Sequence, residues 1–320
     1  MDPGSRADVG RLAPGPRHHL WVTLGGEVAV TGEPAGLVWA EAAEGGPSAA
    51  PTGTGEAEWL FLGESARGHL WALLLPAVPS DTQADADVAS DDEIEALPLP
   101  TGARWANLKD VLGELGEEDS EAALTAVALA RWHQRHSFSP VTGEATEVTS
   151  SGWVRRGPGG DLHFPRTDAA VIMAVTDDAD RLLLARGRGW APGRLSVLAG
   201  FVEPGESLEQ AVAREVDEEV GVAVTDVRYV GSQPWPFPSS LMVGFTASAG
   251  HQPGTHVPAS SLEHDEIVEA RWFTRAELAE AVSAGEVQPP GLISIARRLI
   301  EDWFGGPLPQ HAELRGSIRD

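Results

Sequence analysis

The chain has 320 residues and is strongly acidic, with 48 Asp and Glu against 23 Lys and Arg and a formal net charge of −25 at pH 7. This charge argues against broad electrostatic binding to nucleic acid or to anionic membranes, although a metal ion and a few arginines could still hold a small anionic ligand. The sequence contains no cysteine, which excludes disulfides and thiolate metal sites. It shows no run as long as a membrane span and no apolar signal-peptide core, so we expect a cytoplasmic protein without a membrane partner.

The N-terminal part predicts a disordered tail and a small β-rich domain. Residues 1–17 are rich in Gly, Pro and Arg and are expected to be disordered. Residues 18–106 contain short apolar segments separated by turns, which are typical of strands: HLWVTL, VAV, GLVWA, EWLFLG and HLWALLLP. The acidic residues 78–95 indicate a flexible loop in this domain. We expect the tryptophans of these strands to lie in its core.

Residues 107–136 are predicted to be a helical connector. Apolar residues at helical spacing indicate a short first helix and then a longer second helix, which Asp119 or Ser120 could cap. His133 and His136 near the end of the second helix could indicate a metal ligand pair. No acidic or thiol partner accompanies them in a known pattern, so we expect a structural role.

The rest of the chain divides into a polar segment, an alternating region and a tail. Residues 137–166 are polar and rich in turns, and residues 306–320 are expected to form a tail. Between them, residues 167–305 contain the strand-like runs AAVIMAV, LLLARG, RLSVLAGFV, VAVTDVRYVGSQPW, SLMVGFTASA and EIVEARWF. RAELAEAV and ISIARRLIEDWF are typical of helices. Mixed strands with helices on both sides predict an α/β (α+β) fold.

The most informative stretch is LAGFVEPGESLEQAVAREVDEEVGV, at residues 198–222. A glycine-containing loop leads into a helix that is crowded with carboxylates. Ser207 stands at a good N-cap position, and Gln210 stands where a capping box requires Glu or Gln. Gly221 is placed to end the helix in the left-handed conformation. The stretch therefore predicts a helix with defined start and stop signals.

Three glutamates of this predicted helix share one face, because Glu215, Glu218 and Glu219 stand at i, i+3 and i+4. Like charges at i, i+4 repel by about 0.2–0.5 kcal/mol for each pair, and they lie at the helix end that disfavours anions. Divalent cations such as Mg²⁺ or Mn²⁺ take oxygen ligands and would supply the missing counter-charge. A solvated acidic face is the alternative. The glycines, the loop glutamate and the Arg214–Glu215 pair occur here together, which favours the metal site over a chance cluster of acids.

These residues resemble the Nudix box. Gly200, five residues, Glu206, seven residues and then REVDEEVGV from Arg214 to Val222 match that long and specific motif at every position. The resemblance implies a Nudix hydrolase, which cleaves a nucleoside diphosphate linked to another group with the help of a divalent metal. It also implies an α/β/α sandwich for residues 167–305.

A second resemblance, to the NADH pyrophosphatase branch of this family, rests on SQPWPFPSS at residues 232–240. Its alternating prolines make a rigid extended segment that presents two aromatic rings at low entropic cost. A rigid loop with core aromatics is the alternative, but beside the box we favour a ligand site. The expected substrate-contacting residues are Gln233, Pro234, Trp235, Pro236, Phe237, Pro238, Ser239 and Ser240. The resemblance covers roughly residues 104–304.

In that branch, the place of residues 137–166 usually holds a zinc ribbon with two CxxC knuckles. Ser139 and Thr142 stand at the first knuckle here, and Gly157 and Gly160 stand at the second. Hydroxyl and hydrogen side chains cannot replace thiolate ligands. We therefore expect a degenerate zinc-ribbon-like module without structural zinc. Its shape should be held by hairpin packing around Phe138, Val148 and Trp153.

Other site residues follow from the resemblance one at a time. Glu266 stands where the family has a further metal-binding or water-handling glutamate, and Ala199 offers a backbone carbonyl to the metal. Phe201 is expected beside the base, and Ala296 matches a small residue that lines the nucleotide site. Phe164 replaces a substrate-contacting tyrosine and has no hydroxyl with which to bind the substrate.

The resemblance implies a homodimer that hydrolyses the diphosphate bond of NADH or NAD⁺ to NMN(H) and AMP, and the same bond of NADPH. The predicted ligands of Mg²⁺ or Mn²⁺ are the Glu215, Glu218, Glu219 and Glu266 carboxylates and the Ala199 carbonyl. One of these carboxylates would act as the base, and Arg214 would orient the glutamates. Two alternatives stay open. One is removal of NAD caps from RNA 5′ ends, and the other is a non-catalytic nucleotide-binding regulator, which the intact box disfavours.

Overall fold

The computed structural model describes residues 16–23, 25–41, 58–75, 99–258, 262 and 266–309. The predicted acidic loop lies outside the described residues, as do most of the two predicted tails. The chain divides into two compact units, residues 1–167 with 236–239 and residues 168–235 with 240–320. In the described parts, no helix is both long enough and apolar enough to cross a membrane.

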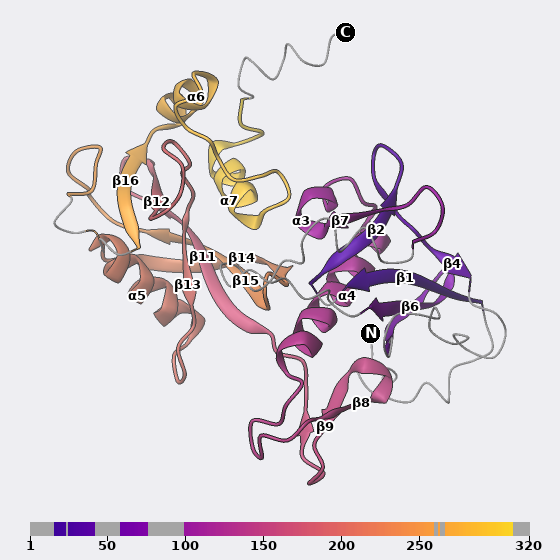
Figure 1. Ribbon diagram of the computed structural model, residues 1–320. Helices are drawn as coiled ribbons and strands as arrows, with labels where there is room; N and C mark the ends of the chain where they lie inside the picture. Colours follow the sequence, from indigo (N-terminus) through magenta and orange to yellow (C-terminus); the bar gives the residue numbers. More distant parts are fainter. Residues whose placement is uncertain are drawn as a thin grey trace. The chain divides into compact units, whose positions relative to one another are not determined.

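Within the described residues, the first unit is built on a seven-stranded sheet, which confirms the predicted β-rich domain (Figure 1). Its strands are β1 (Arg17–Thr23), β2 (Glu27–Thr31), β3 (Gly36–Leu37), β4 (Ala40–Glu41), β5 (Glu58–Ser65), β6 (Gly68–Leu75) and β7 (Arg104–Asn107). The main path is β3-β2-β1-β6-β5, with β1 parallel to β6. The predicted strand GLVWA is in fact two short strands, β3 and β4, which pair with different partners. The tryptophans Trp21 and Trp71 are buried, as expected.

The connector contains α3 (Leu108–Val111) and α4 (Glu117–Arg135). The predicted start of the second helix was wrong, because α4 begins at Glu117 after Gly116. Its first turn holds three acidic residues, which the positive end of the helix dipole favours. The Asp119 carboxylate accepts hydrogen bonds from Trp39 Nε1 at 3.1 Å and Arg67 Nη1 at 2.9 Å. Tertiary contacts therefore use the side chain that was expected to cap the helix.

The polar module forms a three-stranded antiparallel sheet of β8 (Glu147–Thr149), β9 (Val154–Arg156) and β10 (Leu162–His163). The expected packing around Phe138 was wrong, since this side chain is 65% exposed. Trp153 does anchor the module, because its Nε1 donates to the carbonyl oxygen of Phe61 at 2.7 Å.

A polar network joins the two segments that align with the cysteine knuckles. Ser139 Oγ donates to Asp161 Oδ2 at 2.6 Å, and His163 Nε2 lies 2.6 Å from the same oxygen. Ser139 Oγ also accepts from the backbone N–H of Val141 at 3.1 Å. A β-carbon on Gly157 would lie 2.3 Å from Asp161 Oδ1, so the glycine leaves room for this carboxylate. Hydrogen bonds to Asp161 thus connect the two knuckle segments.

The second unit is an α/β/α sandwich, as predicted. Among the described residues, its six-stranded sheet follows the path β14-β15-β11-β12-β16, with β13 paired to β11. The strands are β11 (Asp168–Thr176), β12 (Leu182–Gly187), β13 (Leu198–Phe201), β14 (Thr225–Trp235), β15 (Ser240–Ser248) and β16 (Ile267–Phe273). The helices are α5 (Leu208–Val220), α6 (Arg275–Ser283) and α7 (Ile295–Phe304). In Figure 1, α5 covers one side of the sheet, and α6 and α7 lie on the other.

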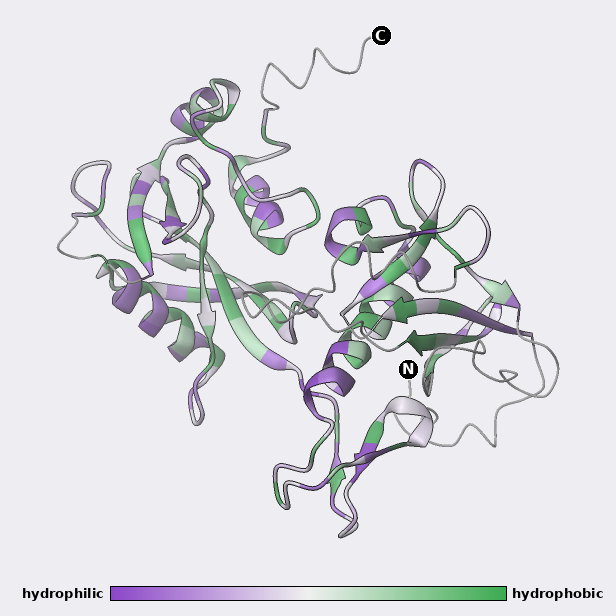
Figure 2. Ribbon diagram, viewed as in Figure 1, coloured by the Kyte–Doolittle hydropathy of each residue, from purple (hydrophilic) through white to green (hydrophobic). Residues whose placement is uncertain are grey.

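Strand β11 supplies side chains to both cores of this sandwich. Val171 and Met173 pack with the apolar face of α5, whereas Ile172 and Ala174 pack with residues of α6 and α7. The apolar run AAVIMAV is therefore buried on both faces, which explains why its residues do not alternate with polar ones. In Figure 2, β11 is coloured mainly as hydrophobic (green), whereas the ribbon of α5 is banded with hydrophilic residues (purple).

Candidate active site

Helix α5 begins and ends where the sequence predicts. Gln210 N donates to Ser207 Oγ at 3.2 Å, and Ser207 N donates to Gln210 Oε1 at 2.8 Å, which completes the capping box. Gly221 ends the helix with φ at 66°, a conformation that costs glycine little. Val212 and Val216 lie on the inner face of α5 and are fully buried. This apolar face therefore sets the rotation of the helix about its axis.

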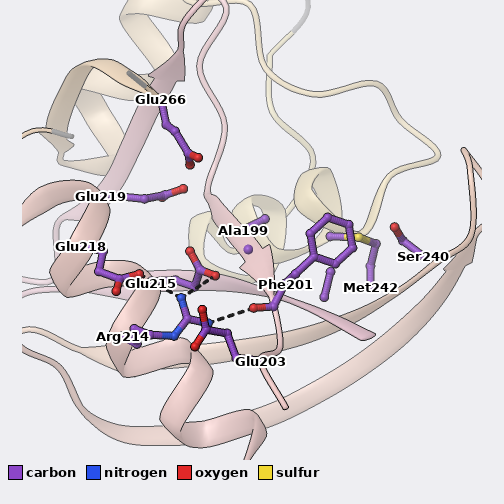
Figure 3. A pocket seen from close by; sticks show the side chains of 12 residues that line it. Ala199, Phe201, Glu203, Arg214, Glu215, Glu218, Glu219, Ser240, Met242 and Glu266 are labelled. Carbon is purple, nitrogen blue, oxygen red and sulfur yellow. Dashed lines mark hydrogen bonds and ion pairs between the residues drawn. The ribbon is translucent and has the colours of Figure 1, made fainter. Parts of the chain in front are cut away.

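That rotation directs the glutamates of α5 toward one pocket. Glu215 and Glu219 are buried, with 9% and 5% of their surface exposed, and Glu218 is exposed at the rim. The pocket has a volume of about 520 Å³. Its lining residues are Ala170, Ala199, Gly200, Phe201, Glu203, Arg214, Glu215, Glu218, Glu219, Ser240, Met242 and Glu266. Figure 3 shows that the acidic side chains gather on one side, while Phe201, Met242 and Ser240 lie on the other.

Arg214 is bonded to several of these acids. Its Nε and Nη2 donate to the two carboxylate oxygens of Glu206 at 2.8 and 3.0 Å. Its Nη1 donates to both Glu215 and Glu218 at 2.9 Å, and Nη2 donates to the Phe201 carbonyl at 2.9 Å. The arginine thus ties the box loop to the helix. This geometry supports an orienting role for Arg214, which stays a prediction.

The charges of the pocket perturb the acids that face it. Burial raises the pKa of Glu215, although the hydrogen bond from Arg214 and its charge act in the opposite sense, and the charges of Glu218 and Glu266 add to the rise. The Arg214 guanidinium lowers the pKa of Glu206 below its usual range. Glu215 is therefore a buried carboxylate among like charges, and an added cation would favour its ionised form.

The donor set fits a hard divalent cation. Carboxylate and carbonyl oxygens are the ligands that Mg²⁺ and Mn²⁺ prefer, and the pocket offers five carboxylates beside the β13 backbone at Ala199, four of them predicted ligands. Gly200 carries no side chain, and a β-carbon there would overlap the Glu215 carboxylate. Among the described residues, no three acidic or histidine side chains stand close enough to share one ion as they are placed. Hydrogen bonds to Arg214 hold Glu215 and Glu218 in this arrangement.

The other predicted site residues are only partly brought together. Phe201, Ser240 and Glu266 line the pocket, as does Ala199. Ala296 does not line the pocket, because this residue of α7 is buried in the core. Phe164 belongs to the first unit, where its side chain is 62% exposed.

The proline-rich signature is divided between the two units. Gln233 lies on β14 in the second unit, and both ends of its amide are engaged: Nε2 donates to the Ile293 carbonyl, and Oε1 accepts from Ile295 N, each at 2.7 Å. Residues 236–239 belong to the first unit. There the Phe237 ring faces Lys109 Nζ at 4.7 Å and the Arg131 guanidinium at 5.3 Å from its centroid. Pro234 and Trp235 end β14, and Ser240 is the one signature residue that lines the pocket described above.

Sequence reasoning missed three residues that line this pocket. Glu203 lies in a variable position of the box, so the motif did not single it out. Ala170 on β11 and Met242 on β15 pair directly across parallel strands. That register joins segments far apart in the chain, and no local signal in the sequence could have revealed it.

Comparison with known proteins agrees with this geometry. The NUDIX domain family model matches residues 165–291. The chain is 43% identical over 256 residues to a Mycobacterium bovis protein named NAD-capped RNA hydrolase NudC, with 77% of this chain and 75% of that protein covered. It is 42% identical, with the same coverage, to the protein of that name from Mycobacterium tuberculosis. Human NAD-capped RNA hydrolase NUDT12 is 39% identical over 60% of this chain and 43% of its own length.

Proposed function

This chain belongs to the Nudix hydrolase family, in its NAD-capped RNA hydrolase and NADH pyrophosphatase branch, and we propose that it hydrolyses the diphosphate bond of NADH to NMNH and AMP. NAD⁺ and NADPH contain the same bond and are further proposed substrates. The observation that carries the proposal is the gathering of Glu215, Glu218, Glu219 and Glu266 around one pocket beside the Ala199 backbone.

The same chemistry on a larger substrate is the second candidate. An NAD cap at the 5′ end of an RNA presents the same diphosphate bond, and the named relatives are NAD-capped RNA hydrolases. The net charge of −25 opposes binding of a long polyanion, so an RNA substrate would need local positive contacts. A non-catalytic regulator is disfavoured, because a nucleotide sensor does not require the complete box.

We propose that the glutamates of the pocket and the Ala199 carbonyl would hold Mg²⁺ or Mn²⁺. When bound, such an ion neutralises charge on the diphosphate and lowers the pKa of a coordinated water. The residues of the pocket would hold this ion in place. Arg214 keeps Glu215 and Glu218 in place through bonds of 2.9 Å. Phe201, exposed at the rim, offers a ring on which a planar base could stack.

Removal of the proton from the attacking water requires a carboxylate in the pocket. Glu219 and Glu266 both point into it (Figure 3), and Glu218 stands at its rim. Any of the three could accept the proton, and we propose that one of them does. A homodimer, implied by the family resemblance, and a cytoplasmic location, expected from the sequence, are also proposals. Light scattering after size-exclusion chromatography tests the first.

Product analysis on a panel of substrates tests the proposed function. The full chain would be incubated with Mg²⁺ or Mn²⁺ and NADH, NAD⁺, NADPH, ADP-ribose, diadenosine polyphosphates or NAD-capped RNA, and the products separated by chromatography. We expect NMN(H) and AMP from NAD⁺ and NADH, NMNH and adenosine 2′,5′-bisphosphate from NADPH, and a 5′-monophosphate on the decapped RNA. A chelator should abolish turnover, and the added metal should restore it. Preferential hydrolysis of ADP-ribose or diadenosine polyphosphates would contradict the proposal, and binding of NADH without turnover would favour the regulator.

A further inference from the structure

A loop rich in arginine begins at the edge of the pocket. We call residues 186–194, which read RGRGWAPGR, the arginine loop; they start at the end of β12 and lead toward β13. The backbone N–H of Arg188 donates to the carbonyl oxygen of Glu266 at 2.6 Å. Because Glu266 lines the pocket, this hydrogen bond places the start of the loop beside the proposed catalytic carboxylates.

Backbone hydrogen bonds hold the arginine loop at both ends. Near its start, Trp190 N donates to the Gly187 carbonyl at 3.2 Å. At its far end, Gln288 N donates to the Gly193 carbonyl at 2.8 Å, and Leu195 N donates to the Gln288 carbonyl at 3.3 Å. A surface that is ordered before binding loses less conformational entropy when a ligand arrives. The loop is therefore a preformed surface.

The side chains of the loop form an exposed stack of an arginine on an indole. The Arg194 guanidinium lies 4.9 Å from the centroid of the Trp190 ring. Trp190 is 37% exposed, and Arg188 and Arg194 are both exposed. Arg186 is only partly exposed and pairs with Glu269 at 3.2 Å. The loop thus presents two exposed guanidinium groups and a cation–π stack, and it begins next to the pocket.

We propose that the arginine loop binds the RNA that follows an NAD cap, with Arg188 and Arg194 on its phosphates and the Trp190–Arg194 stack beneath a base. This inference rests on the proposed function. Guanidinium groups match phosphate geometry, and aromatic and arginine planes support bases of single strands without reading their sequence. Free NADH has no phosphodiester beyond its diphosphate. The loop should therefore act on capped RNA and leave the free dinucleotide unaffected.

The test compares two substrates and three variants of the full chain. The variants are Arg194→Ala, Arg188→Ala and, as a matched control with the same loss of charge, Arg228→Ala, since Arg228 is an exposed residue of β14. For a short NAD-capped RNA, we expect each loop variant to lower kcat/KM by about three- to tenfold while NADH hydrolysis stays within a factor of about two. The slope of log kcat/KM against log salt should become shallower by about 0.7 for each phosphate that a variant no longer neutralises.

A binding measurement makes the inference independent of turnover. Fluorescence anisotropy with a 5′-monophosphorylated RNA should show weaker binding for Arg194→Ala and Arg188→Ala than for the wild type and Arg228→Ala. Equal losses on NADH and capped RNA, a loss confined to NADPH, or equal effects of all three variants would overturn the inference. Hydrolysis of NADH with neither turnover nor binding of RNA would overturn it and leave the NADH activity in place. Failure to hydrolyse any NAD compound would instead refute the proposed function, and the anisotropy comparison would still decide whether the loop binds RNA.

Discussion

Gly200 and Glu215 approach each other so closely that a β-carbon on Gly200 would lie 1.9 Å from the carboxyl carbon of Glu215. The first residue of the box motif is therefore a glycine because a proposed metal ligand occupies the space that a side chain would fill. The spacing of the motif thus encodes a tertiary contact between β13 and α5.

Gly200→Ala should displace the Glu215 carboxylate and lower kcat for NADH by about a hundredfold, since a displacement of about 1 Å can cost that much in a catalytic site. The variant should still fold, because Gly200 is not among the glycines with positive φ. Gly291→Ala is the matched control, as no atom lies within 4 Å of a β-carbon there. The comparison needs steady-state kinetics and a thermal melt of each protein. Wild-type turnover by a folded Gly200→Ala enzyme would show that Glu215 need not hold its position.

Glu219→Gln should lower kcat by orders of magnitude at saturating Mg²⁺ or Mn²⁺, because the amide nearly keeps the volume but loses the charge that faces the metal. The side chain is buried at the pocket, so solvent cannot replace it easily. Glu209→Gln, an exposed change in the first turn of the same helix, should leave kcat near the wild-type value. Near-normal turnover in Glu219→Gln would remove Glu219 from the proposed ligand set.

Gln233→Met should destabilise the second unit by about 1–3 kcal/mol, since it removes two hydrogen bonds of 2.7 Å and leaves the Ile293 carbonyl and the Ile295 N–H without these partners. Urea unfolding of this variant and of Ser232→Ala, an exposed change on the same strand, would measure the difference. A fall in kcat/KM with unchanged stability would instead favour direct contact between Gln233 and substrate.

Ser139→Ala should have an unfolding free energy about 1–2 kcal/mol below that of the wild type. The buried Ser139 hydroxyl donates to Asp161 and accepts from the Val141 N–H, and the variant loses both hydrogen bonds. Thr142→Ala, at the exposed position of the same knuckle, should have a much smaller effect.

We also expect purified protein to contain no stoichiometric zinc and a zinc-selective chelator to leave the Tm unchanged. One tightly held zinc per chain, with unfolding on its removal, would show that the polar network does not replace the metal.

His133 should make the fold less stable as the pH falls toward 4. Burial lowers the pKa of its imidazole from 6.5 to about 4, while its Nε2 lies 2.9 Å from the Gly152 carbonyl. Between these values the unfolded chain binds a proton that the folded chain excludes. The contribution of His133 is therefore complete above pH 6.5 and decreases by about 3 kcal/mol as the pH falls to 4. Unfolding free energies of the wild type and His133→Gln at several pH values would measure it, and parallel pH profiles would contradict it.

The sequence by itself determined the local features of this protein. Its start and stop residues defined α5, the four-residue spacing of its valines defined its buried face, and the box placed Glu215, Glu218 and Glu219 together. Such features depend on residues within one or two helical turns, whose chemistry the sequence displays directly. The strand-like runs also became strands, because β-branched and aromatic residues pack well on a pleated surface.

Only the tertiary structure decided which distant residues meet. Met242 reaches the pocket through the register of β15 on β11, and Gln233 turns its amide to the start of α7 instead of to the pocket. Phe138 is apolar yet exposed, whereas its neighbour Ser139 is polar, buried and hydrogen-bonded to Asp161. Strand register and the burial of a polar group depend on the free energy of contacts between segments far apart in the chain, and no short window of sequence contains both partners.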